Sequence, residues 1–235
     1  IDQFVPAYKV GSGDITWLEI IERMGEKGKP ILLATGASNF DEVDKAMNIA
    51  LSKTKDIVLM QCNTNYTASL DNFNYINLNV LKTYRQLYPE VILGLSDHTP
   101  GLTTVLGAVA LGARVIEKHF TDDNNRSGPD HKFSLDPNEL KIMIKQIRQA
   151  EKSFGKGEKQ VLKDEKELRE FAVRSIQAIK EIKKGEKFQE GENMEILRSG
   201  NKTRGSDARF LMKINGKRSI RSIKLGEGIR LKDVI

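Results

Sequence analysis

The stretch Val91-Ile-Leu-Gly-Leu-Ser-Asp-His-Thr99 decides the fold class. Its first five residues are apolar or small and predict a buried β-strand. A run of four polar residues, which includes a histidine, follows directly. The same order recurs further along, where a predicted strand at Arg114–His119 is followed by Phe-Thr-Asp122. Strands that end in polar, chemically versatile side chains are typical of sites built on parallel sheets.

Similar strand–loop units lie closer to the N-terminus. We predict five strands, at Ala7–Val10, Pro30–Ala34, Asp56–Gln61, Val91–Leu95 and Arg114–His119. Amphipathic stretches of helical period separate and follow them, and we predict helices at Thr16–Met24, Asn39–Ser52, Ile76–Leu87, Thr103–Leu111 and Pro137–Phe154. Ser38 and Asp41 resemble a capping box at the second helix. Alternating strands and helices indicate an α/β fold with a parallel sheet.

The polar residues distinguish between two such folds. A polar or glycine-rich cluster follows each strand, namely Gly11-Ser-Gly-Asp14, Thr35-Gly36, Asn63-Thr-Asn-Tyr66, Ser96-Asp-His-Thr99 and His119-Phe-Thr-Asp122. A doubly wound sheet concentrates its site at one switch point, whereas a TIM (β/α)8 barrel brings all carboxyl ends of its strands to one mouth. We therefore predict a TIM barrel. Five strands cannot close it, and the chain opens with Ile1, so we expect its first strands to be missing.

A charged, glycine-rich segment at 155–165 divides the sequence. We predict a partial barrel domain at 1–155, a linker at 156–168 and a small all-β domain at 169–235. The last region contains an internal sequence repeat. Its two copies, Ile182-Lys-Lys-Gly-Glu-Lys-Phe188 and Ile223-Lys-Leu-Gly-Glu-Gly-Ile229, follow the same residue pattern. A domain of roughly 65 residues buries only a small core, so we expect it to be stabilised by packing against another protein surface.

The composition excludes several classes of protein. The 235 residues carry a formal charge of +6, but the basic residues are scattered among acids, which argues against nucleic-acid binding. Cys62 is the only cysteine, so an internal disulfide and a cysteine-based zinc cluster are excluded, and a reducing cytoplasm is expected. No apolar run reaches the ~20 residues of a membrane span, and no leader is recognised, so we predict a soluble protein.

Two histidines and a lysine are the first candidates for chemistry. His98 and His119 close consecutive strands, and neutral imidazoles at one barrel mouth can share a divalent cation. The alternative is one packed core histidine and one solvated loop residue. Lys9, followed by Gly11-Ser-Gly13, combines a cation with backbone N–H groups that can approach a phosphate or carboxylate. A tight turn is the competing interpretation.

Uncharged polar residues form a second group of candidates. The run Asn63-Thr-Asn-Tyr66 offers donors and acceptors suited to a polyhydroxylated, N-acetylated substrate, although asparagine-rich turns look similar. Asp130 and His131 follow Gly128-Pro129 beyond the last strand and could hold sugar hydroxyls. A solvated loop explains them equally well.

Several strings, taken together and in order, resemble one known family. Tyr8-Lys-Val-Gly-Ser-Gly-Asp14, Leu93-Gly-Leu-Ser-Asp-His-Thr99, Ile116-Glu-Lys-His-Phe-Thr121 and Gly128-Pro-Asp-His131 are similar to the N-acetylneuraminate (sialic acid) synthase family, which includes legionaminic and pseudaminic acid synthases. The C-terminal region, including Arg198-Ser-Gly-Asn201, resembles that family's antifreeze-like (SAF) domain. The resemblance implies a TIM barrel joined to a small β-clip domain, in a domain-swapped homodimer whose small domains cover the partner's barrel mouth.

The resemblance also implies a reaction and roles for individual residues. Phosphoenolpyruvate would condense with an N-acetylated amino sugar, N-acetylmannosamine or a related hexose, to give a nonulosonic acid and phosphate. His98 and His119 would bind the divalent metal, Mn2+ with Mg2+ or Co2+ as alternatives. The other implied roles are phosphoenolpyruvate binding by Lys9, Ser12 and Ser96, sugar binding by Thr64, Tyr66 and Asp130, proton transfer by Asp14, and contact of Arg198 with the N-acetyl group from the other subunit.

Other functions remain open at this point. One is a non-catalytic carbohydrate-binding or assembly protein with a degenerate barrel as its scaffold. Another is a different phosphoenolpyruvate-dependent sugar-acid synthase, or an aldolase that forms a Schiff base on Lys9 or Lys118. Family members carry earlier barrel strands with an acidic sugar contact and a further lysine, so we expect this chain alone to be inactive.

Overall fold

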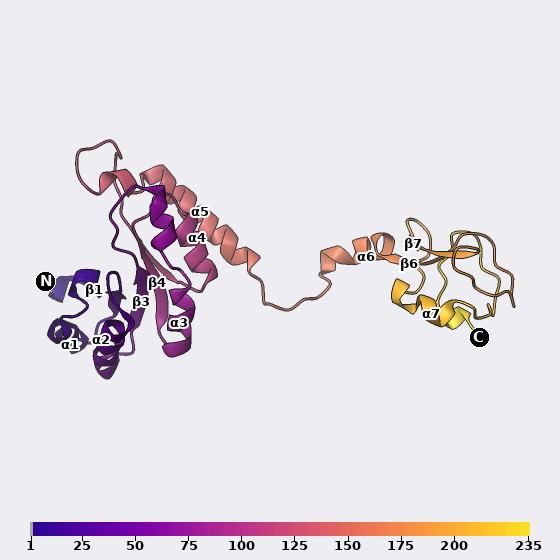
Figure 1. Ribbon diagram of the computed structural model, residues 1–235, viewed down its shortest axis with the longest axis horizontal. Coiled ribbons are helices and arrows are strands. Elements are labelled where there is room, and N and C mark those ends of the chain that lie inside the picture. Colours follow the sequence, from indigo (N-terminus) through magenta and orange to yellow (C-terminus); the bar gives the residue numbers. More distant parts are fainter. Residues whose placement is uncertain (1) are drawn as a thin grey trace. The chain divides into compact units, whose positions relative to one another are not determined.

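A computed structural model describes residues 2–235, which form two compact units (Figure 1). The first unit extends to Gly157, and the second comprises Glu158–Ile235. Each unit has its own cluster of buried apolar side chains, so each has the core that an independently folded region requires.

The first unit is built on a parallel sheet of five strands in the order β1-β2-β3-β4-β5. The strands are β1 (Tyr8–Val10), β2 (Ile31–Ala34), β3 (Ile57–Cys62), β4 (Ile92–Asp97) and β5 (Val115–Lys118). All six residues of β3 are buried, as expected for a central strand covered on both faces. The predicted parallel sheet is confirmed, and β4 is longer than predicted because Ser96 and Asp97 continue its ladder with β5.

The five predicted helices of this unit are also present. They are α1 (Leu18–Gly25), α2 (Phe40–Lys53), α3 (Val80–Leu87), α4 (Thr103–Ala110) and α5 (Pro137–Ser153). The predicted cap of α2 is wrong by one residue. Asn39 accepts a hydrogen bond from the Glu42 backbone N–H, and Glu42 accepts one from Asn39, whereas the Ser38 hydroxyl donates to Gly36. Asn39 has the extended backbone of an N-cap, so its side chain takes this place.

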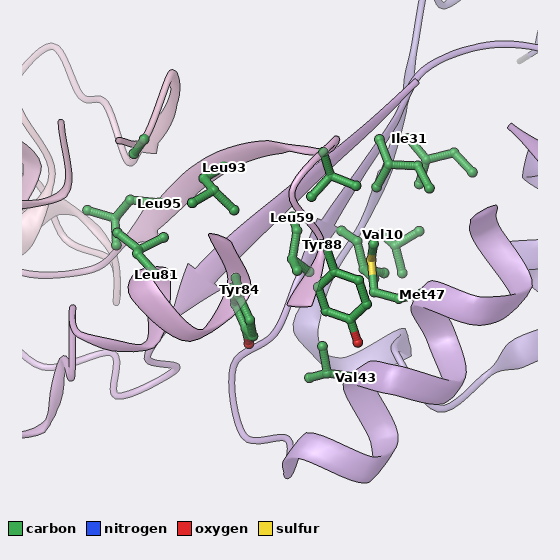
Figure 2. Packing of buried hydrophobic residues seen from close by; sticks show 14 of the residues in the cluster. Val10, Ile31, Val43, Met47, Leu59, Leu81, Tyr84, Tyr88, Leu93 and Leu95 are labelled. Atoms are coloured by element: carbon green, nitrogen blue, oxygen red, sulfur yellow. The ribbon is translucent and has the colours of Figure 1, made fainter. Parts of the chain in front are cut away.

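Apolar side chains of the sheet pack against the helices that cover it (Figure 2). Ile31 and Leu59 of the sheet, Met47 of α2 and Leu81 of α3 are all fully buried. Each such side chain contributes roughly 1.5–3 kcal/mol through the removal of apolar surface from water. The buried Tyr84 hydroxyl is satisfied by Thr35, at 3.0 Å. This packing makes a rigid base for the residues at the carboxyl ends of the strands.

The sheet is strongly curled. Lys9 of β1 and Glu117 of β5 form an ion pair of 3.1 Å, although their strands are the first and last of the sheet. Neighbouring strands lie about 4.8 Å apart, so a flat sheet would separate β1 from β5 by about 19 Å. A Lys–Glu contact across that distance is impossible. The carboxyl ends of β1 and β5 therefore face each other, as they do in a barrel.

The second unit contains an antiparallel pair, β6 (Arg174–Ala178) with β7 (Met194–Arg198). The two copies of the internal sequence repeat contact each other in this unit, because Ile182 and Ile223 exchange backbone hydrogen bonds of 2.9 and 2.8 Å. Their apolar residues contribute to one core together with residues from β6 and β7. That core consists of Ile176, Ala178, Ile182, Phe188, Met194, Ile214, Ile223 and Ile229.

The region 169–235 is not all-β, contrary to the prediction. Helix α6 (Lys166–Ala172) crosses the predicted boundary between linker and domain, and α7 (Leu211–Ile214) lies within the region. The sequence of α6, Lys-Glu-Leu-Arg-Glu-Phe-Ala, consists mostly of good helix formers. The prediction of an all-β region rested on the turn motifs and did not take these residues into account. Short 3-10 turns complete the chain, at Asp2–Phe4, Ser12–Asp14, Leu70–Tyr75, His131–Phe133, Lys163–Glu165, Ala208–Phe210 and Leu231–Asp233. Across residues 2–235, no helix combines the length and apolar character needed to cross a membrane.

Candidate functional site

A cavity of about 530 Å3 lies at the carboxyl ends of the first unit's strands. It is lined by Lys9, Gly11, Ser12, Cys62, Tyr66, Ser96, Asp97, His98, Glu117, Lys118 and His119. The predicted residues Lys9, Ser12, Tyr66, Ser96, His98 and His119 are therefore brought together, although β1, β3, β4 and β5 supply them separately. The curl of the sheet produces this convergence.

His98 follows the end of β4 and is buried. Its Nδ1 lies 2.8 Å from the backbone oxygen of Asn63. Because a carbonyl oxygen can only accept, Nδ1 carries the proton and Nε2 keeps its lone pair. Burial lowers the pKa of His98, and the hydrogen bond to Asn63 opposes this only in part. His98 is therefore a neutral imidazole with a free Nε2 at neutral pH.

His119 follows β5 and faces His98, with ring centroids 5.1 Å apart. Its Nδ1 lies 3.5 Å from the Asp130 carboxylate. Each imidazole thus has an oxygen partner at Nδ1, which is the arrangement that orients histidine ligands towards a metal through Nε2. No group of three or more His, Cys, Asp and Glu side chains within residues 2–235 is arranged to hold a metal. These residues fit a divalent cation held by two imidazoles, whose other positions would be open to water or substrate.

Aromatic rings surround the two histidines. Tyr66 lies 4.1 Å from His98 and 5.9 Å from His119, measured between ring centroids. Phe133, which is only 2% exposed, packs edge-on against His119 at 5.0 Å. Burial, followed by the nearby Cys62 and Asp130, raises the pKa of the Tyr66 phenol, so its hydroxyl is a donor at neutral pH. The rings restrict the imidazoles and leave the phenol able to bind a polar ligand.

Lys9 is the exposed cation of the cavity. Its side chain is 32% exposed and is paired with Glu117. Beside it, the Ser12 hydroxyl accepts a hydrogen bond of 2.9 Å from the Gly36 backbone N–H. A methyl group at Gly36 would overlap Thr64 and approach Ser12 and Cys62, so the glycine permits this close packing. Lys9 and Ser12 together offer a cation and a hydroxyl to an anion.

The remaining predicted residues do not line the cavity. Asp14 is exposed and its carboxylate lies close to Gly11, while Thr64 packs against Gly36. Asp130 is beside the cavity, through its approach to His119. Arg198 is exposed at the end of β7 in the second unit.

The sequence interpretation did not assign Glu117 or Asp97 to the site and considered Lys118 only for a Schiff base, but all three line the cavity. Glu117 precedes His119 by two residues, and side chains two apart on a strand share a face. That alternation could have identified it. Asp97 and Lys118 each directly precede a candidate histidine, but nothing in the sequence indicates that they pair with each other.

The sequence of the chain is similar to those of known proteins. Residues 1–159 match the NeuB family. The chain belongs to this family. It is 41% identical over 226 residues to N,N'-diacetyllegionaminic acid synthase of Campylobacter jejuni, covering 95% of this chain and 65% of that protein. It is 33% identical over 181 residues to human N-acetylneuraminate-9-phosphate synthase, covering 77% of this chain and 50% of that protein.

A solved structure supports the fold of this NeuB family chain. The crystal structure of SpsE, a spore coat polysaccharide biosynthesis protein of Bacillus subtilis, superposes with a TM-score of 0.59 at 33% identity. The match covers 97% of this chain and 67% of that one. The chain spans about two thirds or less of the length of the relatives it matches.

Proposed function

We propose that the protein carrying this chain condenses phosphoenolpyruvate with an N-acetylated amino sugar to give a nonulosonic acid and phosphate. The observation that carries the proposal is the convergence of Lys9, Ser12, Ser96, His98 and His119 on one cavity. The names of the relatives, a legionaminic acid synthase and an N-acetylneuraminate-9-phosphate synthase, support it. In this reaction C3 of phosphoenolpyruvate bonds to the sugar's aldehyde carbon, water adds at C2, and phosphate leaves by C–O cleavage.

The side of the cavity with Lys9 suits the anionic substrate. Phosphoenolpyruvate carries a phosphate and a carboxylate, and Lys9 is the exposed cation that can pair with one of them. In our proposal the substrate displaces Glu117 from Lys9, while the hydroxyls of Ser12 and Ser96 donate to its oxygens. Charge-assisted hydrogen bonds of this kind are the strong ones in anion recognition.

The side with the histidines suits the sugar. His98 and His119 would hold the divalent cation, Mn2+ or alternatively Mg2+ or Co2+, which when bound polarises the sugar's aldehyde oxygen. Tyr66 would donate its phenol to the sugar, and Asp130 would accept from a hydroxyl. Thr64, which packs against Gly36, would add a further contact to the sugar, and the exposed Asp14 would move a proton.

We further propose that the curled sheet belongs to a TIM barrel and that the second unit is an antifreeze-like domain. In a domain-swapped dimer, Arg198 would reach the N-acetyl group of the sugar at the partner's cavity. Its planar guanidinium offers fixed donors to an amide oxygen. The support is the resemblance of Arg198-Ser-Gly-Asn201 to the family together with the exposure of Arg198 at the end of β7.

The test of the anion site is Lys9→Met in the whole protein. We expect the KM for phosphoenolpyruvate to rise, or kcat to fall, by about 10- to 100-fold, as loss of a charge-assisted hydrogen bond implies. The KM for the sugar should change little. Lys45→Met is the matched control, because Lys45 lies on the surface of α2, where it pairs with Asp41. A larger effect on the sugar KM than on the phosphoenolpyruvate KM would refute the assignment.

A further inference from the structure

A buried ion pair joins β4 to β5 next to the cavity. The Lys118 Nζ lies 2.9 Å from Asp97 Oδ2, and the two side chains are only 4% and 1% exposed. Asp97 and Lys118 are also direct partners in the register of the parallel ladder. The pair therefore closes the carboxyl end of the ladder with a side-chain link in addition to the backbone hydrogen bonds.

The pair is part of a larger hydrogen-bond network. Thr99 donates to Asp97 through both its hydroxyl and its backbone N–H, at 2.9 and 3.2 Å. Thr104, in the first turn of α4, donates to Asp97 Oδ2 at 2.7 Å. Lys118 also donates to the backbone oxygen of Thr99. β4, β5 and α4 are thus held together at one point, and satisfied networks of this kind are rigid.

The position of the network is informative. His98 follows Asp97 directly, and His119 follows Lys118 directly. The backbone of both candidate ligands therefore leaves the sheet from residues that the ion pair clamps. Metal–ligand distances tolerate deviations of only about 0.2 Å, so small shifts between the two strand ends would matter.

We propose that Asp97 and Lys118 are positioning residues, which set the spacing of His98 and His119 for one shared cation. The inference rests on the cation site of the proposed function. A substrate-binding role for Lys118 is disfavoured, since its ammonium group already contacts Asp97 and Thr99. Taking two charges out of water costs free energy that often outweighs their attraction, so a buried pair is weak evidence of stabilisation and leaves room for a positioning role.

The experiment compares three forms of the whole protein: wild type, the double variant Asp97→Asn/Lys118→Met, and Tyr84→Phe. The double variant removes both charges together, so neither is left buried alone. Tyr84→Phe is the control, because it removes a buried hydrogen bond of the same unit, between α3 and Thr35, in which neither histidine takes part. We would measure Mn2+ affinity by electron paramagnetic resonance, and the imidazole N–H signals by NMR without metal.

We expect the double variant to fold and to bind Mn2+ about 10- to 100-fold more weakly, the usual cost of losing residues that orient metal ligands. The His98 Nδ1 proton, protected by Asn63 in wild type, should exchange faster. Tyr84→Phe should keep the wild-type Mn2+ affinity and the slow exchange of the His98 Nδ1 proton, whatever its melting temperature. Unchanged Mn2+ affinity and imidazole signals in a folded double variant would overturn the inference.

A milder variant serves if the double variant does not fold. Thr104→Val removes one hydrogen bond to Asp97 but leaves the ion pair, and should weaken Mn2+ binding several-fold. Unchanged binding and imidazole signals in that variant would equally overturn the inference. A wild-type chain that binds no Mn2+, even with phosphoenolpyruvate, would refute the proposed cation site instead. The metal-free imidazole signals would still decide whether the pair positions the histidines.

Discussion

The two units use polar side chains in opposite ways. In the first, Lys9, His98 and His119 come from different strand ends and meet at a cavity. In the second, one polar contact is local and repeated, since Glu186 accepts from the Lys183 backbone N–H and Glu227 from that of Lys224. The first unit gathers these polar groups at a cavity, while the second uses these carboxylates to hold its own turns.

The backbone packing differs in the same way. In the first unit large apolar side chains fill the space between the strands and the helices, as Figure 2 shows around Leu59 and Met47. In the second unit two chain segments cross at Gly205 and Gly228 with no room for a side chain. The comparison suggests that substitutions at the cavity of the first unit reduce function, whereas substitutions at this crossing reduce stability.

The largest effect is expected from His98→Ala. Removing one of two imidazole ligands should lower metal-dependent turnover of the whole protein by about 1,000-fold, because the cation contributes several kcal/mol to the transition state. Circular dichroism should show an unchanged fold, since His98 is not part of the cluster of buried apolar side chains. Retained activity would contradict the metal assignment and the division of roles between the units.

The next effect concerns the crossing in the second unit. A methyl group at Gly205 would overlap the backbone oxygen of Ile176, which cannot move without breaking the β6–β7 pair. Gly205→Ala should therefore destabilise this unit by about 3 kcal/mol, at the upper end for overpacking. Gly13→Ala is the control, because the space around Gly13 is open. Hydrogen exchange resolved by unit would measure both, and equal effects would contradict the comparison.

A smaller effect should appear as a pH dependence of the second unit. Burial opposes ionisation of Asp233, but Arg221 and the Arg230 backbone N–H outweigh it and hold the pKa of Asp233 below its ordinary value. A carboxyl whose pKa is lowered by folding stabilises the protein above the unfolded pKa of about 3.9, and this is lost as the pH falls through the folded value. The second unit should therefore lose stability below about pH 4.

Arg221→Met tests this explanation. It should cost the second unit about 2 kcal/mol at pH 7, the usual range for hydrogen bonds to charged groups. It should also flatten the dependence of unfolding free energy on pH below about pH 4. Urea unfolding at pH 3 and pH 7 would measure both, and an undiminished acid dependence in the variant would assign it to other carboxyls.

The smallest effect is expected at the capping box of α2. Asn39→Ala should destabilise the first unit by about 1 kcal/mol, because it leaves a backbone N–H of the first turn without its partner. Ser38→Ala should cost less, since the Ser38 hydroxyl bonds only to Gly36 outside the helix. Thermal melting of the two variants would rank them, and the opposite order would restore Ser38 as the cap.

Much of the first unit could be predicted without coordinates. Apolar runs of strand length predicted the strands β1–β5, and amphipathic stretches of helical period predicted the helices α1–α5. Predictions failed where a single residue decides the outcome, as at the cap of α2, or where helix formers lie among turn motifs, as in α6. Short-range preferences are weak and are overridden by neighbouring contacts.

The sequence by itself determined the parallel sheet and the placing of His98 and His119 at the ends of consecutive strands, because periodicity and strand order are local properties of the chain. Only the tertiary structure decided that the sheet curls until Lys9 meets Glu117, and that Asp97 pairs with Lys118, each directly before one of the two histidines. Those contacts depend on strand register and sheet curvature. Both arise from the packing of the whole unit, so no short segment of sequence encodes them.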